Sequence, residues 1–282
     1  METVHMQKRE ETKLERRHRE DLERLKRFRP MDDTFMRGLF KDDIPLAQLV
    51  LRIITGMPDL TLLTCETQAD MKRVTGARSI CLDAYATDSR GRKYDIEVQR
   101  ADSGADPHRA RYHSSVMDVE NLDEKQDYRE LPDTYVIFIT EKDYYKSSEP
   151  LYVIEHMNRT LSQPFEDGAH ILYVNGEYRG DSALGKLMHD FNCTDAGEMN
   201  YELLAQKTRY LKENPKGVSE MCKVMEELRN ESYAEGREEG RAEGTFATLA
   251  GLVRDGLLSI REASQRVNMT EQEFETALRK LK

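Results

Sequence analysis

The sequence lacks paired cysteines and long apolar runs. Its cysteines, Cys65, Cys81, Cys193 and Cys222, lie far apart with no CxxC pair, so neither a zinc ribbon nor a disulfide framework is predicted. The opening METVHMQKREETKLERRHRE has no apolar signal region, and no later stretch reaches the roughly 20 apolar residues that a membrane-spanning helix needs. We therefore expect a soluble, cytoplasmic protein with reduced thiols and no membrane contact.

An excess of positive charge and the common nucleotide-binding motifs are also absent. With 43 Lys and Arg against 53 Asp and Glu, the formal net charge is -10. The protein is therefore not expected to coat nucleic acid through bulk charge, and any DNA contact must be local. Neither GxxxxGK[ST] nor GxGxxG occurs, so no means of binding ATP or a dinucleotide is visible. His108 and His113 lack the spacing of a zincin helix, so a zinc enzyme is not expected.

The length of the chain allows one sizeable core and a smaller appended segment. It has 282 residues, of which 38% are hydrophobic, which is too few for several large domains. We predict a charged N-terminal helix over residues 1–29 and a core over 30–192. A helical extension (193–232), a Gly/Glu/Arg repeat helix (233–248) and a small C-terminal helical segment (249–282) follow.

The hydrophobic periodicity predicts helices, a hairpin, a helix, further strands and then helices. The apolar run 135–140 indicates a central strand buried on both faces. A turn with the sequence DSRGR closes the hairpin. The predicted helices cover 8–28, 31–41, 45–55 and 109–124. The predicted strands cover 80–87, 93–99, 135–140, 151–155 and 170–174, and the chain is expected to be helical from about residue 198.

The C-terminal third has an unusual glycine spacing. Gly236, Gly240 and Gly244 recur among charged residues, although glycine weakens a helix by roughly 1 kcal/mol relative to alanine. One interpretation is a glycine-lined stripe that permits close helix packing in a homodimer, and the other is a solvated, partly frayed linker helix. Further on, Thr270 and Glu273 form a capping-box pattern between short amphipathic helices. A small interaction bundle and a helix-turn-helix both remain open there.

The segment 81–100 carries the chemistry. Side chains alternate along a strand, so Asp95, Glu97 and Gln99 share one face, and the hairpin brings Asp83 beside Glu97. Burying such carboxylates requires a compensating cation, and a hard divalent ion with oxygen ligands is a natural one. The alternative is that these carboxylates lie on the solvent-exposed face of a hairpin, as most carboxylates on strands do.

The order of Asp83, a hairpin turn, Glu97 and Gln99 resembles the PD-(D/E)xK nuclease signature, with Gln99 in the usual lysine position. More narrowly, the chain resembles a family of bacterial PD-(D/E)xK proteins, the recombination-promoting nucleases and transposases. The matching blocks are MDDTFMRGLF, LDAYATDSRGRKYDIEVQ, RARYHSSVMD, YVIFIT and HDFNCTDAGEMNYELLAQKTRYLKE, at residues 31–40, 82–99, 109–118, 135–140 and 189–213.

This resemblance implies an α/β fold with a restriction-endonuclease-like core, in which helices flank a central mixed sheet, and a helical C-terminal region. It implies a DNA endonuclease that depends on Mg²⁺, for which Mn²⁺ substitutes, in recombination or transposition. Asp83 and Glu97 would be the metal ligands, and Gln99 would orient water without supplying lysine's charge. We expect the metal ligands to be solvated and to contribute little to the metal-free core.

Three further residues have a matching position in the family. Asp32 is an expected outer metal ligand, or else only the N-cap of the following helix. Arg109 and Tyr112 are expected to face a substrate phosphate, or else to pack the helix on the sheet. Two other functions stay open, namely a catalytically silent DNA-associated or regulatory protein and a helical oligomerisation protein.

Overall fold

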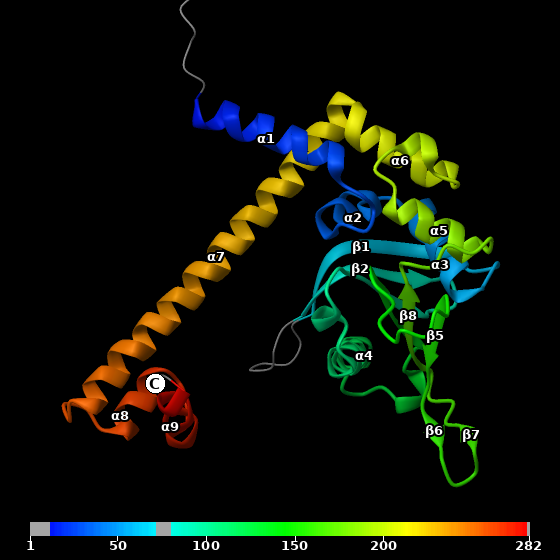
Figure 1. Cartoon of the computed structure of the whole chain (residues 1–282). Coiled ribbons are helices and arrows are strands. Elements are labelled where there is room, and N and C mark those ends of the chain that lie inside the picture. The colour runs from blue at the N-terminus through cyan, green and yellow to red at the C-terminus, as the bar shows by residue number, and fades with distance from the viewer. Residues whose placement is uncertain (1–11, 72–79, 281–282) are drawn as a thin grey trace, which may run out of the picture. The chain divides into compact units, whose positions relative to one another are not determined.

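A computed structural model describes residues 12–71 and 80–280 of the chain, and it shows an α/β protein (Figure 1). Two compact units are present, one up to Met225 and the other from Glu226 onward. The first unit contains a six-stranded mixed sheet flanked by helices. The predicted α/β class and mixed sheet are confirmed.

The sheet runs in the order β1, β2, β3, β4, β8, β5. The β1–β2, β2–β3 and β5–β8 pairs are antiparallel, whereas β3–β4 and β4–β8 are parallel. A separate two-stranded hairpin is formed by β6 and β7. The strands are β1 Leu62–Met71, β2 Ile80–Asp88, β3 Lys93–Gln99, β4 Thr134–Thr140, β5 Leu151–Ile154, β6 Met157–Asn158, β7 Gln163–Pro164 and β8 Ala169–Asn175.

Burial explains which strands the sequence could predict. All residues of β4 are buried, as expected from its apolar run and its place between β3 and β8. The strand β1 was not predicted. It lies at the sheet edge and most of its residues are at least partly exposed, so its sequence LLTCETQADM carries little hydrophobic periodicity.

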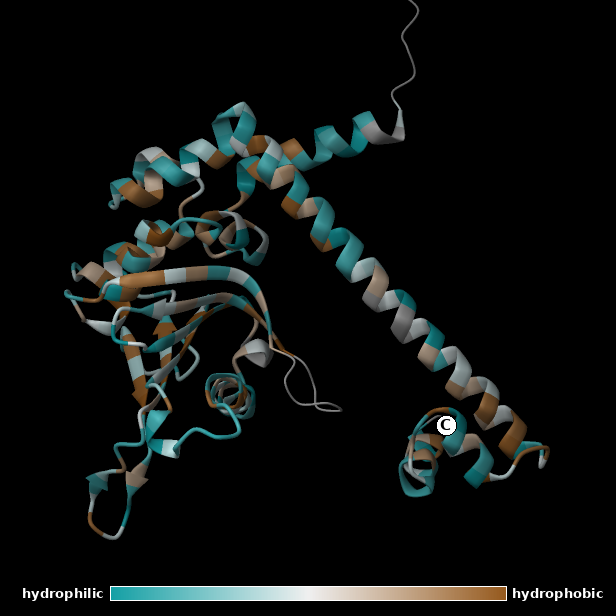
Figure 2. Cartoon of the chain, turned by 180° about the vertical axis from the view of Figure 1, so that it is seen from behind, coloured by the Kyte–Doolittle hydropathy of each residue, from teal (hydrophilic) through white to brown (hydrophobic). Residues whose placement is uncertain are grey.

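Helices cover both faces of the sheet. Figure 1 shows α4 on one face and α2, α3, α5 and α6 over the other. Figure 2 shows brown stretches on several strands among white and teal ones, and α1 largely in teal, as expected for a solvated charged helix. The helices of this unit are α1 Lys13–Arg27, α2 Asp33–Phe40, α3 Ile44–Thr55, α4 Pro107–Asn121, α5 Ala183–Asn192 and α6 Glu202–Glu213, with short 3₁₀ turns η1 Asp102–Ala105, η2 Tyr128–Glu130 and η3 Ala196–Glu198.

The start of α4 is fixed by its own sequence. The Asp106 side chain accepts a hydrogen bond from the His108 N–H, and Pro107 occupies the first turn. Both features favour a helix start, because a capping carboxylate satisfies an unpaired N–H and proline needs no partner there. This start places the side chains of the first turns of α4 beside the end of β3.

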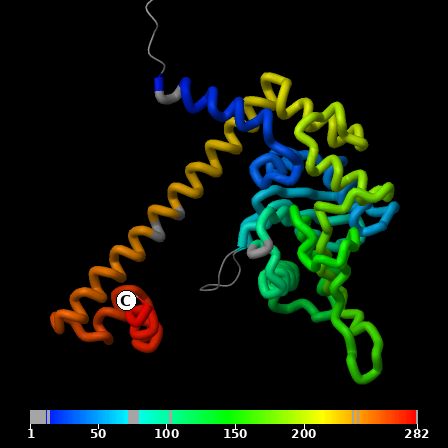
Figure 3. Tube along the Cα trace, viewed as in Figure 1, coloured from blue at the N-terminus to red at the C-terminus, as the bar shows by residue number. Residues whose placement is uncertain are grey.

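The second unit is helical. A long helix, α7 Pro215–Arg254, includes the glycine repeat and contains the boundary between the units, and α8 Ile260–Arg266 and α9 Glu271–Lys280 follow. The Cα trace in Figure 3 follows this order. Phe274 of α9 belongs to a small core with Leu249 and Ala263. The predicted capping box is confirmed, because the Glu273 N–H donates to Thr270 Oγ1 and the Thr270 N–H donates to Glu273.

Within the described ranges, no helix combines the length and the apolar character that crossing a membrane would require.

Candidate active site

The candidate site lies where the β2–β3 hairpin opens. The regular ladder pairs Ala84–Thr87 with Lys93–Ile96. Beyond it, side chains replace backbone partners: the Asp83 N–H donates to Glu97 Oε1 at 3.0 Å, and the Val98 N–H donates to Asp83 Oδ2 at 3.3 Å. The structure thus brings Asp83 and Glu97 together, as the sequence predicted. We call this region, with Asp83, Asp95, Glu97 and Gln99, the open end of the hairpin.

The carboxylates of the open end are buried. Asp95 and Glu97 are 0% exposed and Asp83 is 9% exposed. The alternative of a solvent-exposed hairpin face is therefore wrong, and so is the expectation that the metal ligands are solvated. The reason is tertiary, because α4 covers this face of the sheet and the Phe138 ring of β4 lies beside Glu97 in the strand register.

A chain of hydrogen bonds connects these carboxylates to α4. Arg109 Nη2 donates to Glu97 Oε2 at 2.9 Å, and Arg109 Nε donates to His113 Nε2 at 3.2 Å. His113 Nδ1 lies 2.8 Å from Asp95 Oδ2. Since a guanidinium only donates, His113 Nε2 must accept, and the ring proton therefore sits on Nδ1 and is donated to Asp95. Sequence reasoning placed Arg109 near the site but missed His113.

Gln99 lies beside Glu97, as its place in the signature predicts. Its Nε2 donates to Glu97 Oε2 at 3.3 Å, the same oxygen that Arg109 contacts. The side chain of Gln99 packs against Gly104 of η1, where a Cβ would collide with Gln99 Oε1. A glycine at position 104 therefore leaves room for the amide.

The electrostatics of the open end favour protonation. Burial, followed by repulsion from Asp95, raises the pKa of Glu97 to about 8. Burial, followed by repulsion from Glu97 and Asp33, also raises the pKa of Asp83. The pKa of Asp95 is raised first by burial and then by the charge of Asp83. These carboxylates lack enough positive charge around them.

The same residues suit a hard divalent cation. Asp95 Oδ1 is buried and has no hydrogen-bond partner among residues 12–71 and 80–280. Asp95, Glu97 and His113 each have one possible ligand atom within 4.8 Å of the others. Both nitrogens of His113 are hydrogen-bonded, to Arg109 and to Asp95, so the carboxylates are the groups left to bind an ion. Oxygen-rich, negatively charged sites are those that Mg²⁺ and Mn²⁺ prefer. Asp95 was expected on this face but not in the metal set, and His113 was set aside because it has no histidine partner at helical spacing.

Asp32 makes other contacts. Its carboxylate accepts from the Arg29 N–H at 2.8 Å and pairs with Arg29 and Arg100, each at 3.3 Å. It is the N-cap residue of α2, as the alternative predicted, but its side chain makes no capping hydrogen bond. The neighbouring Asp33 is close enough for its charge to raise the pKa of Asp83. The Asp33 carboxylate itself pairs with Arg37 of the same helix.

Tyr112 is half-buried on α4, one helical turn after Arg109. This spacing puts both side chains on one flank of the helix.

The other end of the hairpin, the turn end, holds a buried carboxylate of a different kind. Asp88 is 1% exposed and accepts from the N–H groups of Arg90 and Arg92, from Arg92 Nε and from the Tyr94 hydroxyl. Burial acts to raise its pKa, but the hydrogen bonds from Arg92, Tyr94 and the two N–H groups outweigh it and lower the pKa. This carboxylate is fully paired within the protein.

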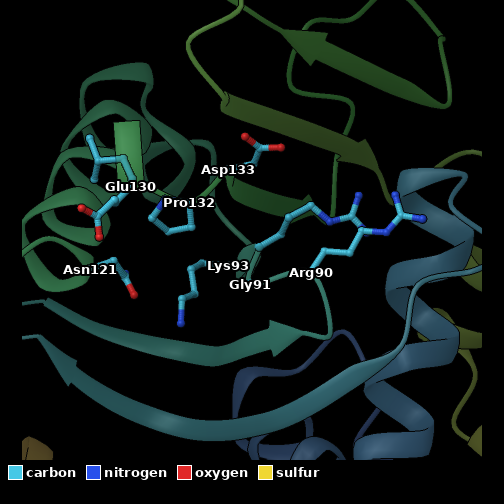
Figure 4. Close-up of a pocket in the computed structure, with 9 residues that line it drawn as sticks. Arg90, Gly91, Lys93, Asn121, Glu130, Pro132 and Asp133 are labelled. Carbon is cyan, nitrogen blue, oxygen red and sulfur yellow. The ribbon is translucent and has the colours of Figure 1, made fainter. Parts of the chain in front are cut away.

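A pocket of about 580 Å³ also lies at the turn end. Figure 4 shows Arg90, Lys93, Glu130 and Asp133 around it, so its lining carries both signs of charge. It is separate from the carboxylates of the open end, which lie at the opposite end of β3.

A second metal-like group has a structural role. His189, Asp190 and Cys193 lie close together at the end of α5. The Asp190 carboxylate, however, accepts from the N–H groups of Asn200 and Tyr201, each at 2.8 Å. It therefore ties the end of α5 to the segment that leads into α6.

The α/β core with its mixed sheet has the architecture expected of a PD-(D/E)XK nuclease core. Residues 46–177 match the model of the PD-(D/E)XK nuclease family transposases, which confirms the predicted resemblance. No curated protein and no solved structure matches the chain. The match supports a nuclease-like role, and PD-(D/E)XK nucleases usually use divalent metals. The matched range includes the open end and α4, whereas α2 and the second unit lie outside it.

Proposed function

We propose that this protein is a metal-dependent DNA endonuclease that hydrolyses phosphodiester bonds in recombination or transposition. The observation that carries the proposal is the buried, under-neutralised carboxylate cluster at the open end, which lies in the range matched by a nuclease family. Several buried carboxylates close together must either take up protons or be compensated by positive charge. DNA supplies the phosphodiester substrate that this family name implies.

Asp83 and Glu97 would hold a Mg²⁺ ion, with Mn²⁺ as a substitute. The bound ion would polarise a phosphate oxygen and lower the pKa of an attacking water. The protein's own contribution is orientation. Glu97 Oε1 is held by the Asp83 N–H and Asp83 Oδ2 by the Val98 N–H, so each carboxylate keeps its direction.

The residues around these ligands have complementary roles. Gln99 would orient the attacking water through its amide, which is neutral and supplies no charge. Arg109 and Tyr112, one turn apart on α4, would contact a DNA phosphate. Asp32 would be an outer ligand only if it left Arg29 and Arg100. Comparing Asp32→Asn with Asp33→Asn would therefore decide which acidic residue of α2 contributes.

Nicking of supercoiled plasmid by the purified full-length chain tests this proposal. We expect nicked DNA with Mg²⁺ or Mn²⁺ and none after chelation with EDTA. Binding of the plasmid without cleavage in either metal would instead support a catalytically silent DNA-associated or regulatory protein. Self-association without any DNA affinity would support an oligomerisation protein.

We also propose that the C-terminal tail forms a homodimer, which would suit cleavage of both strands. A Cβ at Gly236, Gly240 or Gly244 would meet no described atom within 4 Å apart from its chain neighbours and the nearby backbone of its own helix, so a second helix could approach this stripe closely. Apolar residues such as Val224, Leu228 and Phe246 would be needed to strengthen the contact, and two of them are already used within the chain. Val224 is 7% exposed, and Phe246 packs against the Phe274 ring.

Weak association is therefore expected, since exposed ion pairs contribute only about 0 to 1 kcal/mol each. Deleting residues 233–282 should yield monomers that still nick one strand. Sedimentation of the truncated and full chains in the same oligomeric state would show that the tail is only a linker.

A further inference from the structure

The cation that the signature requires is absent from its usual position in this chain. Position 99 carries glutamine instead of lysine, so the open end has no ammonium group there to stabilise charge at phosphorus. Two arginines act electrostatically on the carboxylates. Arg37 opposes part of the rise in the pKa of Asp83, and Arg109 opposes part of the rise in that of Glu97. Of these, Arg109 donates directly to Glu97.

The Arg109 guanidinium and the Gln99 amide meet at one atom. Arg109 Nη2 lies 2.9 Å and Gln99 Nε2 lies 3.3 Å from Glu97 Oε2. Arg109 of α4 thus places a positive charge at Glu97 Oε2, the atom that Gln99 in the lysine position also contacts. Unlike lysine, arginine stays charged in proteins and presents a planar fork that matches phosphate oxygens.

Arg109 also has the exposure that a substrate contact needs. Its side chain is 40% exposed, whereas the side chain of Glu97 is 1% exposed, so the guanidinium reaches from solvent to the buried carboxylate. Arginine carries five N–H donors, and the hydrogen bonds to Glu97 and His113 use only two of them. The remaining donors can engage a phosphate.

A buried pair fixes the position of this arginine. His113 accepts from Arg109 Nε and donates to Asp95 Oδ2, and the side chains of His113 and Asp95 are 2% and 0% exposed. Because Asp95 orients the ring and sets its tautomer, His113 presents an acceptor at one place only. The guanidinium is thereby pre-oriented, which lowers the entropy lost when it binds an anion.

We propose that Arg109 supplies the positive charge that lysine supplies in the PD-(D/E)xK signature, and that Asp95 and His113 are the positioning residues that hold it. This inference rests on the proposed nuclease function. It assigns Arg109 two successive partners: Glu97 in the metal-free protein, and the scissile phosphate once Glu97 binds a metal.

The first test measures metal binding without DNA. Arg109 competes with a cation for Glu97 Oε2, so Arg109→Ala should bind Mn²⁺ about tenfold more tightly in calorimetric titration at pH 8.5, the worth of one charge-assisted hydrogen bond. Arg109→Gln, which removes the charge but keeps donors, guards against a folding defect. Arg111→Ala is the matched control, because Arg111 is an exposed arginine on the same helix, and it should bind Mn²⁺ like the wild type. Unchanged or weaker Mn²⁺ binding in both Arg109 variants would overturn the proposal.

The second test measures cleavage. Arg109→Ala and Arg109→Gln should cut about a hundredfold more slowly, the usual loss on removing one transition-state donor, while Arg109→Lys keeps at least a tenth of the rate. His113→Phe should slow cleavage about tenfold, as removal of a supporting residue does, with His113→Gln partly restoring it. Tighter metal binding combined with slower cleavage is a pattern that a merely structural arginine would not give.

The third test restores the charge at position 99. Gln99→Lys alone should be tolerated or activating, and in that background Arg109→Ala should lose less than tenfold. An equal loss in both backgrounds would show that Arg109 does not replace lysine. Complete inactivity of Gln99→Lys with its metal still bound would also contradict the proposal.

A wild-type protein that binds Mn²⁺ but never cleaves DNA would remove the proposed nuclease function, whereas an active wild type with fully active Arg109 variants would remove this inference alone.

Discussion

The two ends of the β2–β3 hairpin bury carboxylates with opposite consequences. At the turn end, Asp88 receives donors from Arg92, Tyr94 and the local backbone, and its pKa falls. At the open end, Glu97 accepts from Arg109 and Gln99 and Asp83 accepts from the Val98 N–H, but burial and mutual repulsion outweigh these donors and the pKa values rise. Burial of a carboxylate alone is therefore not the mark of a site. A deficit of positive charge around several buried carboxylates is the feature that points to a cation.

The largest difference between the two ends should appear in catalysis. Asp83→Ala and Glu97→Ala should each reduce metal-dependent plasmid nicking at least about a thousandfold, because a bound metal contributes several kcal/mol to the transition state. Asp88→Ala should keep its intrinsic rate at a temperature where it is folded. Circular dichroism would verify the fold of each variant. Nicking at the wild-type rate by Asp83→Ala or Glu97→Ala would remove both from the metal site.

Stability should show the reverse order. Asp88→Ala should lower the free energy of unfolding by about 3 kcal/mol, because it leaves Arg92 partly buried without its partner. Glu97→Gln should cost little, and at pH 8.5 it should stabilise the metal-free protein, since it removes a charge that the fold disfavours. Urea denaturation in EDTA measures both. An equal loss in the two variants would mean that the two ends are equally well paired.

The pH dependence of stability should come from the open end. The pKa of Glu97 is about 8 in the folded protein and near 4.5 in the absence of its surroundings, so the folded state holds the proton more tightly. The contribution of protonated Glu97 to the free energy of unfolding is then fully present below pH 4.5. It is lost as the pH rises toward 8, by roughly 1 kcal/mol per pH unit for one proton.

Denaturation in EDTA at pH 5.5 and pH 8.5 measures this slope. Glu97→Gln should flatten it, whereas Asp88→Asn should not, because the pKa of Asp88 is shifted downward. Any slope that remains in Glu97→Gln is expected from Asp83 and Asp95, whose pKa values are also raised, and an unchanged slope would contradict the prediction.

The smallest effects should come from two glycines, Gly91 in the turn of the hairpin and Gly104 beside Gln99 at the open end. Gly91 has a φ of 84°, so Gly91→Ala should cost about 1 kcal/mol of stability through backbone strain and leave metal binding unchanged. Gly104→Ala should push the Gln99 amide away from Glu97 and change Mn²⁺ affinity by a few fold, with less than about 1 kcal/mol lost. Thermal melts and Mn²⁺ titration distinguish the pair. Altered Mn²⁺ affinity in Gly91→Ala would show that the ends are coupled.

Much of the fold follows from local sequence. The apolar run of β4 and the turn before β3 were sufficient to predict a buried strand and a hairpin, because these signals depend only on neighbouring residues. The edge strand β1 was missed since its partly exposed residues show little hydrophobic periodicity. The orientation of Asp32 toward Arg29 and Arg100 was also beyond prediction, because the packing of distant segments decides which side chain of α2 faces the site.

The sequence by itself determined that Asp95, Glu97 and Gln99 share one face of β3 and that Asp83 stands opposite, because strand alternation and a short turn leave no other arrangement. Only the tertiary structure decided that this face is buried under α4, and that Arg109 and His113 of that helix reach Glu97 and Asp95. The physical reason is that burial and charge pairing depend on residues from separate elements meeting in space. The sequence pattern of β3 or of α4 alone does not predict how closely the two elements approach each other.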